Sequence, residues 1–158
     1  MNCSNCGKPM SSKRENVKYD SCGLDYVTLL DVEVCRCTDC GEQETVIPNV
    51  EGLHLALARA VAHLPVRLRG REIRFLRKHL GYSGADAAKT LSVRPETMSR
   101  WENDKDVISP AADRFLRLMV ANQNPTQFYP LAELQAKKQE KRPSPIRMRR
   151  NPDWQLAG

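Results

Sequence analysis

The pattern of apolar and polar positions divides the chain into a front part with strand-like alternation and a rear part with helical spacing. Between Tyr19 and Cys35 the segment YDSCGLDYVTLLDVEVC is rich in Val, Leu, Tyr and Thr, with apolar residues alternating at Val32 and Val34. This composition predicts two or three short strands, with a turn at Cys22 and the glycine that follows it.

Helical spacing begins after the segment IPNVEG. The run LHLALARAVAHL places its apolar residues on one helical face, and Pro65 ends it; the face consists of Leu53, Leu57, Ala60, Val61 and Leu64. From Arg71 onward four more helical runs follow, which are REIRFLRKHL, YSGADAAKTL, RPETMSRWEN and PAADRFLRLMVANQ. We expect the first of these five helices to be a packing or connecting helix.

The end of the chain shows the weakest pattern. A last short helix is expected over LAELQAKKQEK, and RPSPIRMRRNPDWQLAG then combines prolines and arginines with almost no periodicity. This predicts a disordered basic tail. The fold class predicted is therefore α+β with two domains, in which residues 1–50 form a small β domain, 51–66 a linker helix, 67–124 an all-α domain, and 125–158 a short helix and the basic tail.

Six cysteines are distributed unevenly over the 158 residues. CSNCG at the start and CTDCG further on repeat one spacing, and 30 residues separate the two pairs. Two such turns, each with a glycine able to adopt positive φ after its second cysteine, are typical of a closed four-thiolate zinc site that stabilises a fold without chemistry. The predicted ligands of one structural Zn²⁺ per chain are Cys3, Cys6, Cys37 and Cys40, which makes the front a zinc-ribbon-like domain.

Cys22 and Cys35 do not belong to either pair. They are interpreted as free thiols of the strands, and redox sensing or a second metal are the alternatives. The start of the chain has no secretory signal pattern, and no run approaches the roughly 18 apolar residues of a membrane span. We therefore expect a soluble cytoplasmic protein, without a membrane partner, whose thiols stay reduced.

The segment GYSGADAAKTLSVRPETMSRWEN predicts a helix-turn-helix. Ser83 can cap the first helix, the pair Ser92 and Val93 forms the turn, and Pro95 suits the first position of the second helix. Inward positions are expected to be Ala87, Ala88, Leu91, Val93, Met98 and Trp101. The residues left to contact DNA are Ser83, Arg94, Glu96, Thr97, Ser99, Arg100 and Lys105, with Arg100 reading a guanine and Ser83 and Lys105 contacting phosphates.

The acidic and basic residues are also distributed differently between the front and the rear of the chain. Residues 1–50 hold five basic and eight acidic side chains, residues 67–124 hold twelve and seven, and residues 137–150 hold seven and one. A basic rear half indicates a polyanionic partner. The sequence has no Ser/His/carboxylate arrangement and no phosphate-binding glycine loop, and the predicted metal site is closed, so we expect no enzyme.

These motifs resemble two known modules. The block IRFLRKHLGYSGADAAKTLSVRPETMSRWEND looks like an Xre/Cro-type helix-turn-helix, and CSNCG with CRCTDCG looks like a YgiT-type zinc finger. In this order they resemble the MqsA family of type II antitoxins and related regulators, although Glu96 and Gly84 depart from residues common at these positions. The resemblance implies a homodimer that represses its own palindromic operator through the helix-turn-helix and binds an RNase toxin through the zinc domain. The alternatives are a stand-alone zinc-finger regulator without a toxin and, more weakly, an RNA-binding protein.

Overall fold

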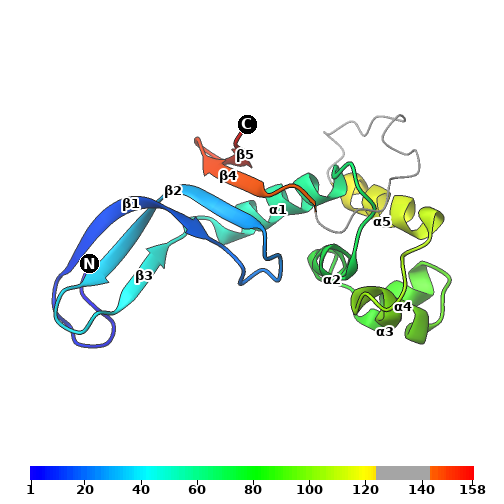
Figure 1. Cartoon of the computed structure of the whole chain (residues 1–158), viewed down its shortest axis with the longest axis horizontal. Coiled ribbons are helices and arrows are strands. Elements are labelled where there is room, and N and C mark those ends of the chain that lie inside the picture. Colours follow the sequence, from blue (N-terminus) through cyan, green and yellow to red (C-terminus); the bar gives the residue numbers. More distant parts are fainter. Residues whose placement is uncertain (124–142) are drawn as a thin grey trace. The chain divides into compact units, whose positions relative to one another are not determined.

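The computed structural model describes residues 1–123 and 143–158, and its contacts divide the chain into two compact units. Unit 1 consists of Met1–Asp20, Asp25–Leu53 and Pro145–Gly158, and unit 2 consists of Ser21–Leu24 and His54–Ser144. The predicted α+β class is confirmed, and the described residues form five strands in one sheet and five helices (Figure 1). The helix predicted over LAELQAKKQEK lies outside the described residues.

Unit 1 is built on one sheet of β1 (Met10–Lys18), β2 (Val27–Cys37), β3 (Gln43–Val46), β4 (Ile146–Arg150) and β5 (Trp154–Leu156). The long strand β2 is central: β1 pairs with it antiparallel along one edge, while β3 and β4 pair with different stretches of the other edge. β3 is antiparallel to β2 and β4 is parallel to it, and β5 returns antiparallel to β4.

The strands of the front differ from the prediction in their bounds. One strand lies before Tyr19, and a single long strand occupies most of the segment that was expected to hold two or three. The register between β1 and β2 shifts around Asn16, where Asp31 adopts φ +55° and donates its backbone N–H to the Asn16 Oδ1 at 3.1 Å. This bulge lets one long strand change the face it buries, with Leu29 buried before it and Val32 after it.

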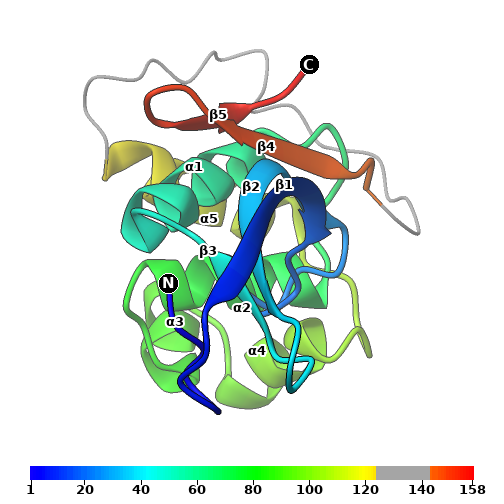
Figure 2. The same cartoon turned by 90° about the vertical axis from the view of Figure 1, so that its left-hand side faces the viewer.

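The prediction of a disordered tail is wrong for residues 143–158. Ile146 and Met148 alternate with arginines, which is the two-residue period of a strand, and both side chains are buried with Trp154. The Trp154 Nε1 donates to the backbone oxygen of Pro48 at 3.0 Å. Figure 2 shows the hairpin that β4 and β5 form, with the C-terminus at its end. The tail therefore belongs to unit 1, whose predicted limit at residue 50 was too narrow.

The helices are α1 (Val50–Ala62), α2 (Gly70–His79), α3 (Gly84–Thr90), α4 (Pro95–Glu102) and α5 (Pro110–Asn122). α1 begins in unit 1 and continues in unit 2, to which the other four belong. Its apolar face is buried as predicted. The side chains of Ser83 and Ser109 cap α3 and α5, and prolines occupy the first positions of α4 and α5, since a missing N–H costs nothing there.

A buried ion pair holds the segment after α1 against α5. Arg117 and Asp113 are one turn apart on α5, both almost fully buried, and the Arg117 Nε donates to the Asp113 Oδ2 at 3.0 Å. The Arg117 guanidinium also donates to the backbone oxygens of Ala62, Leu64 and Val66. Every charged atom is thus matched, which a buried charge requires. Within the described ranges, no helix is both long and apolar enough to cross a membrane.

Candidate metal centre and exposed helix face

The two CxxCG segments of unit 1 form the same turn. In each, the N–H of the glycine donates to the backbone oxygen of the first cysteine, at 2.9 Å for Gly7 and Cys3 and at 3.1 Å for Gly41 and Cys37. Gly7 has φ +72° and Gly41 has φ +75°, so the predicted need for glycine is confirmed. Each turn directs both of its thiols to one side.

These turns bring four cysteines together, and among the described residues no other metal-binding side chain joins the group: Cys3, Cys6, Cys37 and Cys40. Their Sγ atoms all lie within 4.8 Å of one another, and two of the pairs, Cys6 with Cys37 and Cys3 with Cys40, are 3.4 and 3.5 Å apart. Four sulfurs at tetrahedral Zn–S bonds of about 2.3 Å would be about 3.8 Å apart. The geometry therefore fits a zinc ion with no position left for water.

The backbone around the sulfurs favours thiolates. The N–H groups of Cys40 and then Asp39 donate to the Cys37 sulfur and lower the pKa of Cys37 to about 7. The N–H of Lys8 likewise lowers the pKa of Cys6, but the hydrogen bond with Cys37 and burial outweigh it and raise this pKa to about 12. The hydrogen bond between the two sulfurs acts in opposite directions, because it lowers the pKa of Cys37 and raises the pKa of Cys6. A bound cation replaces the thiol protons and leaves all four groups as thiolates.

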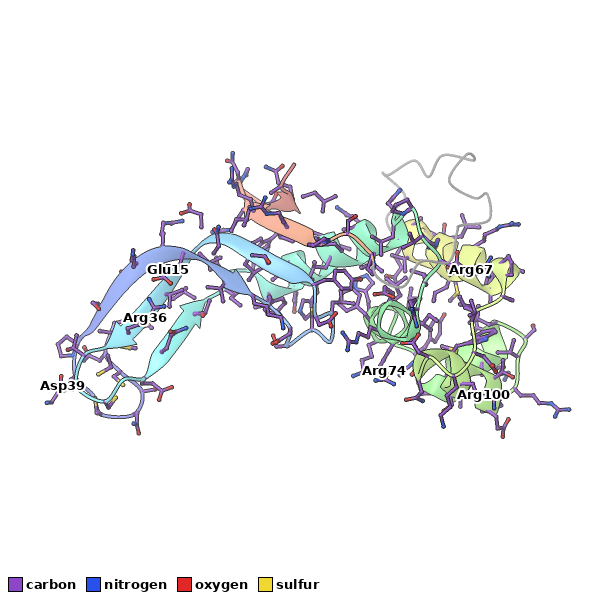
Figure 3. All side chains as sticks on the ribbon, viewed as in Figure 1. Glu15, Arg36, Asp39, Arg67, Arg74 and Arg100 are labelled. Carbon is purple, nitrogen blue, oxygen red and sulfur yellow. The ribbon has the colours of Figure 1, made fainter. Side chains whose placement is uncertain are left out.

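Polar contacts connect the first turn with the second turn and with β3. Lys8 binds Asp39 at 2.8 Å, and the Ser4 hydroxyl donates to the Glu44 Oε1 at 2.7 Å. Figure 3 shows Asp39 beside the sulfurs and, further along the sheet, Glu15 of β1 next to Arg36 of β2. Arg36 donates to both carboxylate oxygens of Glu15, so the pKa of Glu15 is lowered, first by this hydrogen bond. Sequence reasoning missed these pairs because their partners lie far apart in the chain.

Cys35 does not join the metal cluster. It is buried on β2, whereas Cys22 is half-buried and belongs to unit 2.

The second candidate site is the outer face of α4 in unit 2. Met98 and Trp101 are buried, with exposures of 1% and 5%, and so are the small Ala87 and Ala88 of the neighbouring helix α3. The expected inward positions Leu91 and Val93 are half-buried. Ser92 between them takes φ +55°, which reverses the chain between α3 and α4.

The predicted DNA contacts are distributed unevenly around this helix pair. Thr97 is half-buried, and the exposed members of the predicted set are Ser83, Arg94, Glu96, Ser99, Arg100 and Lys105. The Ser83 hydroxyl donates to the Asp86 Oδ2 at 2.6 Å and accepts from the Asp86 N–H, so it closes a capping box. The Ser99 backbone oxygen accepts from the Asn103 Nδ2 at 2.7 Å. Arg94 precedes α4 as its N-cap, and Lys105 follows it in the loop.

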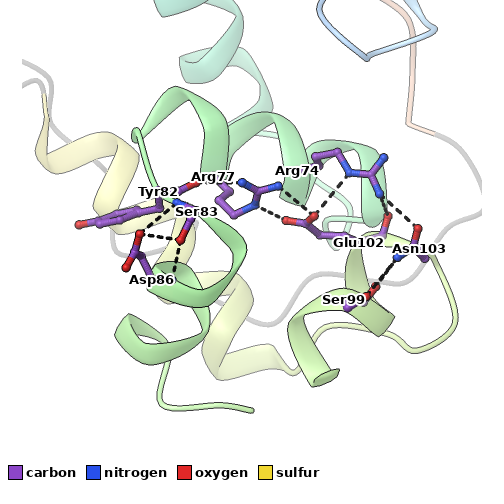
Figure 4. A network of polar contacts seen from close by, with 8 residues as sticks. All are labelled: Arg74, Arg77, Tyr82, Ser83, Asp86, Ser99, Glu102 and Asn103. Carbon is purple, nitrogen blue, oxygen red and sulfur yellow. Dashed lines mark hydrogen bonds and ion pairs between the residues drawn. The ribbon is translucent and has the colours of Figure 1, made fainter. Parts of the chain in front are cut away.

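A polar network fixes the angle between α4 and α2 (Figure 4). Glu102 at the end of α4 accepts from Arg77 and Arg74 of α2, with Arg77 Nε to Oε1 at 2.5 Å and Arg74 Nε to Oε2 at 3.4 Å. Only about a tenth of the Glu102 side chain is exposed. Because α2 holds this carboxylate from two positions, α4 keeps its outer face in a defined direction.

Arg100, the predicted base reader, is paired with Asp106. Its Nε and Nη2 donate to the two Asp106 carboxylate oxygens at 2.5 and 3.2 Å. A two-point contact fixes the plane of the guanidinium, and the remaining donors on Nη1 and Nη2 point away from the carboxylate. This is the orientation in which an arginine can meet the two acceptors of a guanine edge.

Comparison with known proteins adds no relative. The chain matches no protein-family model, no curated protein and no solved structure. The resemblance stated from the motifs therefore stays a prediction, and the functional argument depends on the residues themselves.

Proposed function

We propose that this protein is a sequence-specific DNA-binding transcriptional repressor, in which α3 and α4 form a helix-turn-helix and unit 1 holds one structural zinc ion. The observation that carries the proposal is the separation of buried apolar side chains from exposed polar side chains on α4. Its apolar residues Met98 and Trp101 are buried, while Glu96 and Arg100 on the helix and Arg94 at its N-cap remain exposed. A major groove about 12 Å wide admits such a helix.

The charge of this region supports the same function. Residues 67–124 hold twelve basic against seven acidic side chains, and a basic surface supplies the salt-dependent, sequence-independent part of DNA affinity. Base discrimination then falls to Arg100, held by Asp106, while Lys105 contacts phosphate. Ser83, which the sequence predicted as a second phosphate contact, donates its one hydroxyl proton to Asp86 and keeps the capping role alone. A homodimer on a palindromic operator would place two copies of α4 about one helical turn apart.

The test is a selection of bound duplexes from random DNA, run in parallel on wild type, Arg100→Ala and Arg100→Lys. Wild type should recover a palindrome. Arg100→Ala should lose about 1 to 3 kcal/mol of specific binding and the preference at one base pair in each half-site. Arg100→Lys keeps the charge but not the two-point geometry, so it should retain nonspecific affinity and lose the same preference. Failure of wild type to enrich any palindrome would overturn the proposal.

The resemblance to MqsA-type antitoxins adds a second step, in which unit 1 binds and neutralises an RNase toxin. The alternative is a regulator that acts on DNA without a toxin. Co-expression with the product of the neighbouring reading frame separates these two versions, because an antitoxin copurifies with that product and relieves growth arrest, whereas a stand-alone regulator does neither.

A further inference from the structure

Two exposed acidic side chains near Arg100 differ in whether a basic side chain matches them. Asp106, in the loop after α4, accepts hydrogen bonds from Nε and Nη2 of Arg100. Glu96 is the second residue of α4 and is exposed, and among the described residues no basic side chain forms an ion pair with it. A carboxylate of this kind repels phosphates, so on a surface that meets DNA it needs a compensating contact.

Glu96 lies on the same side of α4 as Arg100, because residues four apart are neighbours on a helix surface. Four residues span about 6 Å of the helix axis, and successive base pairs are about 3.4 Å apart. When α4 lies along a major groove, the two side chains therefore reach base pairs one or two steps apart. The contacts of Glu102 with Arg77 and Arg74 of α2 hold α4 in place within unit 2 and so preserve this spacing.

The chemistry of the carboxylate selects the base. An ionised carboxylate only accepts hydrogen bonds, and in the major groove only the amino groups of cytosine and adenine donate them. The adenine amino group lies between two acceptors, its own N7 and the O4 of the paired thymine. The cytosine amino group has an acceptor on one side only, the O6 of the paired guanine. A carboxylate is therefore repelled less at a cytosine.

We infer that Glu96 is a specificity-determining residue, whose carboxylate accepts a hydrogen bond from the amino group of a cytosine one or two base pairs from the guanine that Arg100 contacts. The inference rests on the proposed function and adds a second base to each half-site. Because the carboxylate repels phosphates on every duplex and gains a hydrogen bond only at cytosine, it acts mainly by weakening binding to other sequences.

A carboxylate at the start of a helix also has a structural role, because it interacts favourably with the helix dipole. The chain offers a matched control for that role. Glu51 is likewise an exposed glutamate at the second position of its helix, α1, and lies in unit 1. Glu51→Gln and Glu96→Gln therefore remove the same charge from the same helical position, and only Glu96→Gln changes the helix-turn-helix.

The first experiment selects bound duplexes from random DNA with wild type, Glu96→Gln and Glu51→Gln, each as the full chain. Glutamine donates as well as accepts, and it pairs with the N6 and N7 of adenine. Glu96→Gln should therefore change the preferred base at one position of each half-site from cytosine to adenine and keep the guanine that depends on Arg100. Glu51→Gln should recover the wild-type motif.

The second experiment tests the hydrogen bond itself on the selected duplex. N4-methylcytosine keeps its pairing hydrogen and replaces the hydrogen that faces the major groove by a methyl group. Placed at the inferred position, it should weaken wild type at least about fivefold, as expected for the loss of a base contact. Glu96→Ala should lose less than about twofold on the same substitution, because the contact is already absent.

The outcomes separate this inference from the proposed function. If wild type enriches no palindrome, both are overturned. If wild type enriches a palindrome with a guanine that depends on Arg100 and Glu96→Gln recovers the identical motif, the repressor stands and the role of Glu96 in specificity is overturned. Equal losses of wild type and Glu96→Ala on N4-methylcytosine would also overturn it, because the amino group would then be sensed by another residue.

Discussion

The two units of this protein bury polar groups in different ways. Unit 2 encloses a complete ion pair, Arg117 with Asp113, at 1% and 2% exposure and saturates it with backbone oxygens. Unit 1 has exposed ion pairs along its sheet and gathers four thiols at the end of the β1–β2 ladder, where two of them, Cys6 and Cys40, are exposed. The buried charges of unit 2 are thus matched by its own groups, whereas the thiol end of unit 1 offers four ligands that could hold a cation.

The largest effect should come from breaking the metal site. Cys37→Ser removes one of four ligands and should abolish zinc binding, which is measured as metal per chain, and should disorder both CxxCG turns while α2 to α5 keep their signals. A structural zinc supplies about 10 to 16 kcal/mol in small domains, so no other contact of unit 1 compensates.

The control is Cys35→Ser, which removes another buried thiol of β2 outside the cluster and should keep one zinc per chain. Full zinc content in Cys37→Ser would show that the four cysteines are not the ligand set.

The second effect tests the core of unit 2. Arg117→Met leaves the Asp113 carboxylate buried without its cation and should lower the free energy of unfolding by about 3 to 5 kcal/mol, measured by urea titration with far-ultraviolet circular dichroism. Arg117→Met with Asp113→Leu should recover part of this loss, because no charge then remains buried. The exposed ion pair of Arg100 with Asp106 offers the contrast, since Arg100→Met should change the free energy of unfolding far less.

The third prediction compares two glycines at the first positions of helices in unit 2. A Cβ at Gly70 would lie 2.5 Å from the backbone oxygen of Glu102, whereas a Cβ at Gly84 meets nothing within 4 Å. Gly70→Ala should therefore destabilise by about 1 to 3 kcal/mol, because α2 must move away from the end of α4. Gly84→Ala should stabilise by about 0.4 to 1 kcal/mol through the unfolded chain. Equal effects in thermal unfolding would contradict this reading of the α2–α4 contact.

Local signals explain what the sequence could predict. The CxxCG spacing, the cap at Ser83 and the proline at the start of α4 each act within a few residues, and each is found as predicted. The α+β class follows from the change between alternating and helical spacing. These features need no knowledge of distant partners.

The features that the sequence could not predict depend on residues far apart in the chain. β1 has no fully buried residue, so its polar sequence gave no strand signal, and it exists because it pairs along β2. β4 carries only two buried apolar residues and pairs in parallel with a strand more than a hundred residues earlier. Arg117 has the sequence context of a surface arginine. It is buried because an earlier segment of the chain, which includes Leu64 and Val66, packs against α5 and accepts its hydrogen bonds.

The smallest effect concerns the carboxylate that holds Arg100. The hydrogen bond from Arg100 lowers the pKa of Asp106 below the ordinary value of 3.8. Desolvation of Asp106 opposes this shift, and the positive charge of Arg100 adds to it. Because the pKa of Asp106 is lower in the folded protein, the pairing contributes fully to folding stability at pH values above the ordinary pKa. This contribution is lost as the pH falls through the lower pKa of the folded state. The pair is therefore complete at neutral pH, and both side chains are about half exposed, so its effect on stability is small.

An NMR titration of the carboxyl carbons checks this pairing directly. Asp106 should titrate below 3.8 in the wild type and return toward that value in Arg100→Ala. Asp86 is the internal control: its pKa is lowered by the Ser83 hydroxyl and backbone N–H, and Arg100→Ala should leave its titration unchanged. If Asp106 titrates at the same pH in both proteins, the carboxylate does not hold the arginine in solution. Asp106→Asn should then leave specific DNA binding intact, whereas a held guanidinium predicts that this substitution weakens binding and that Arg100→Ala adds little further loss.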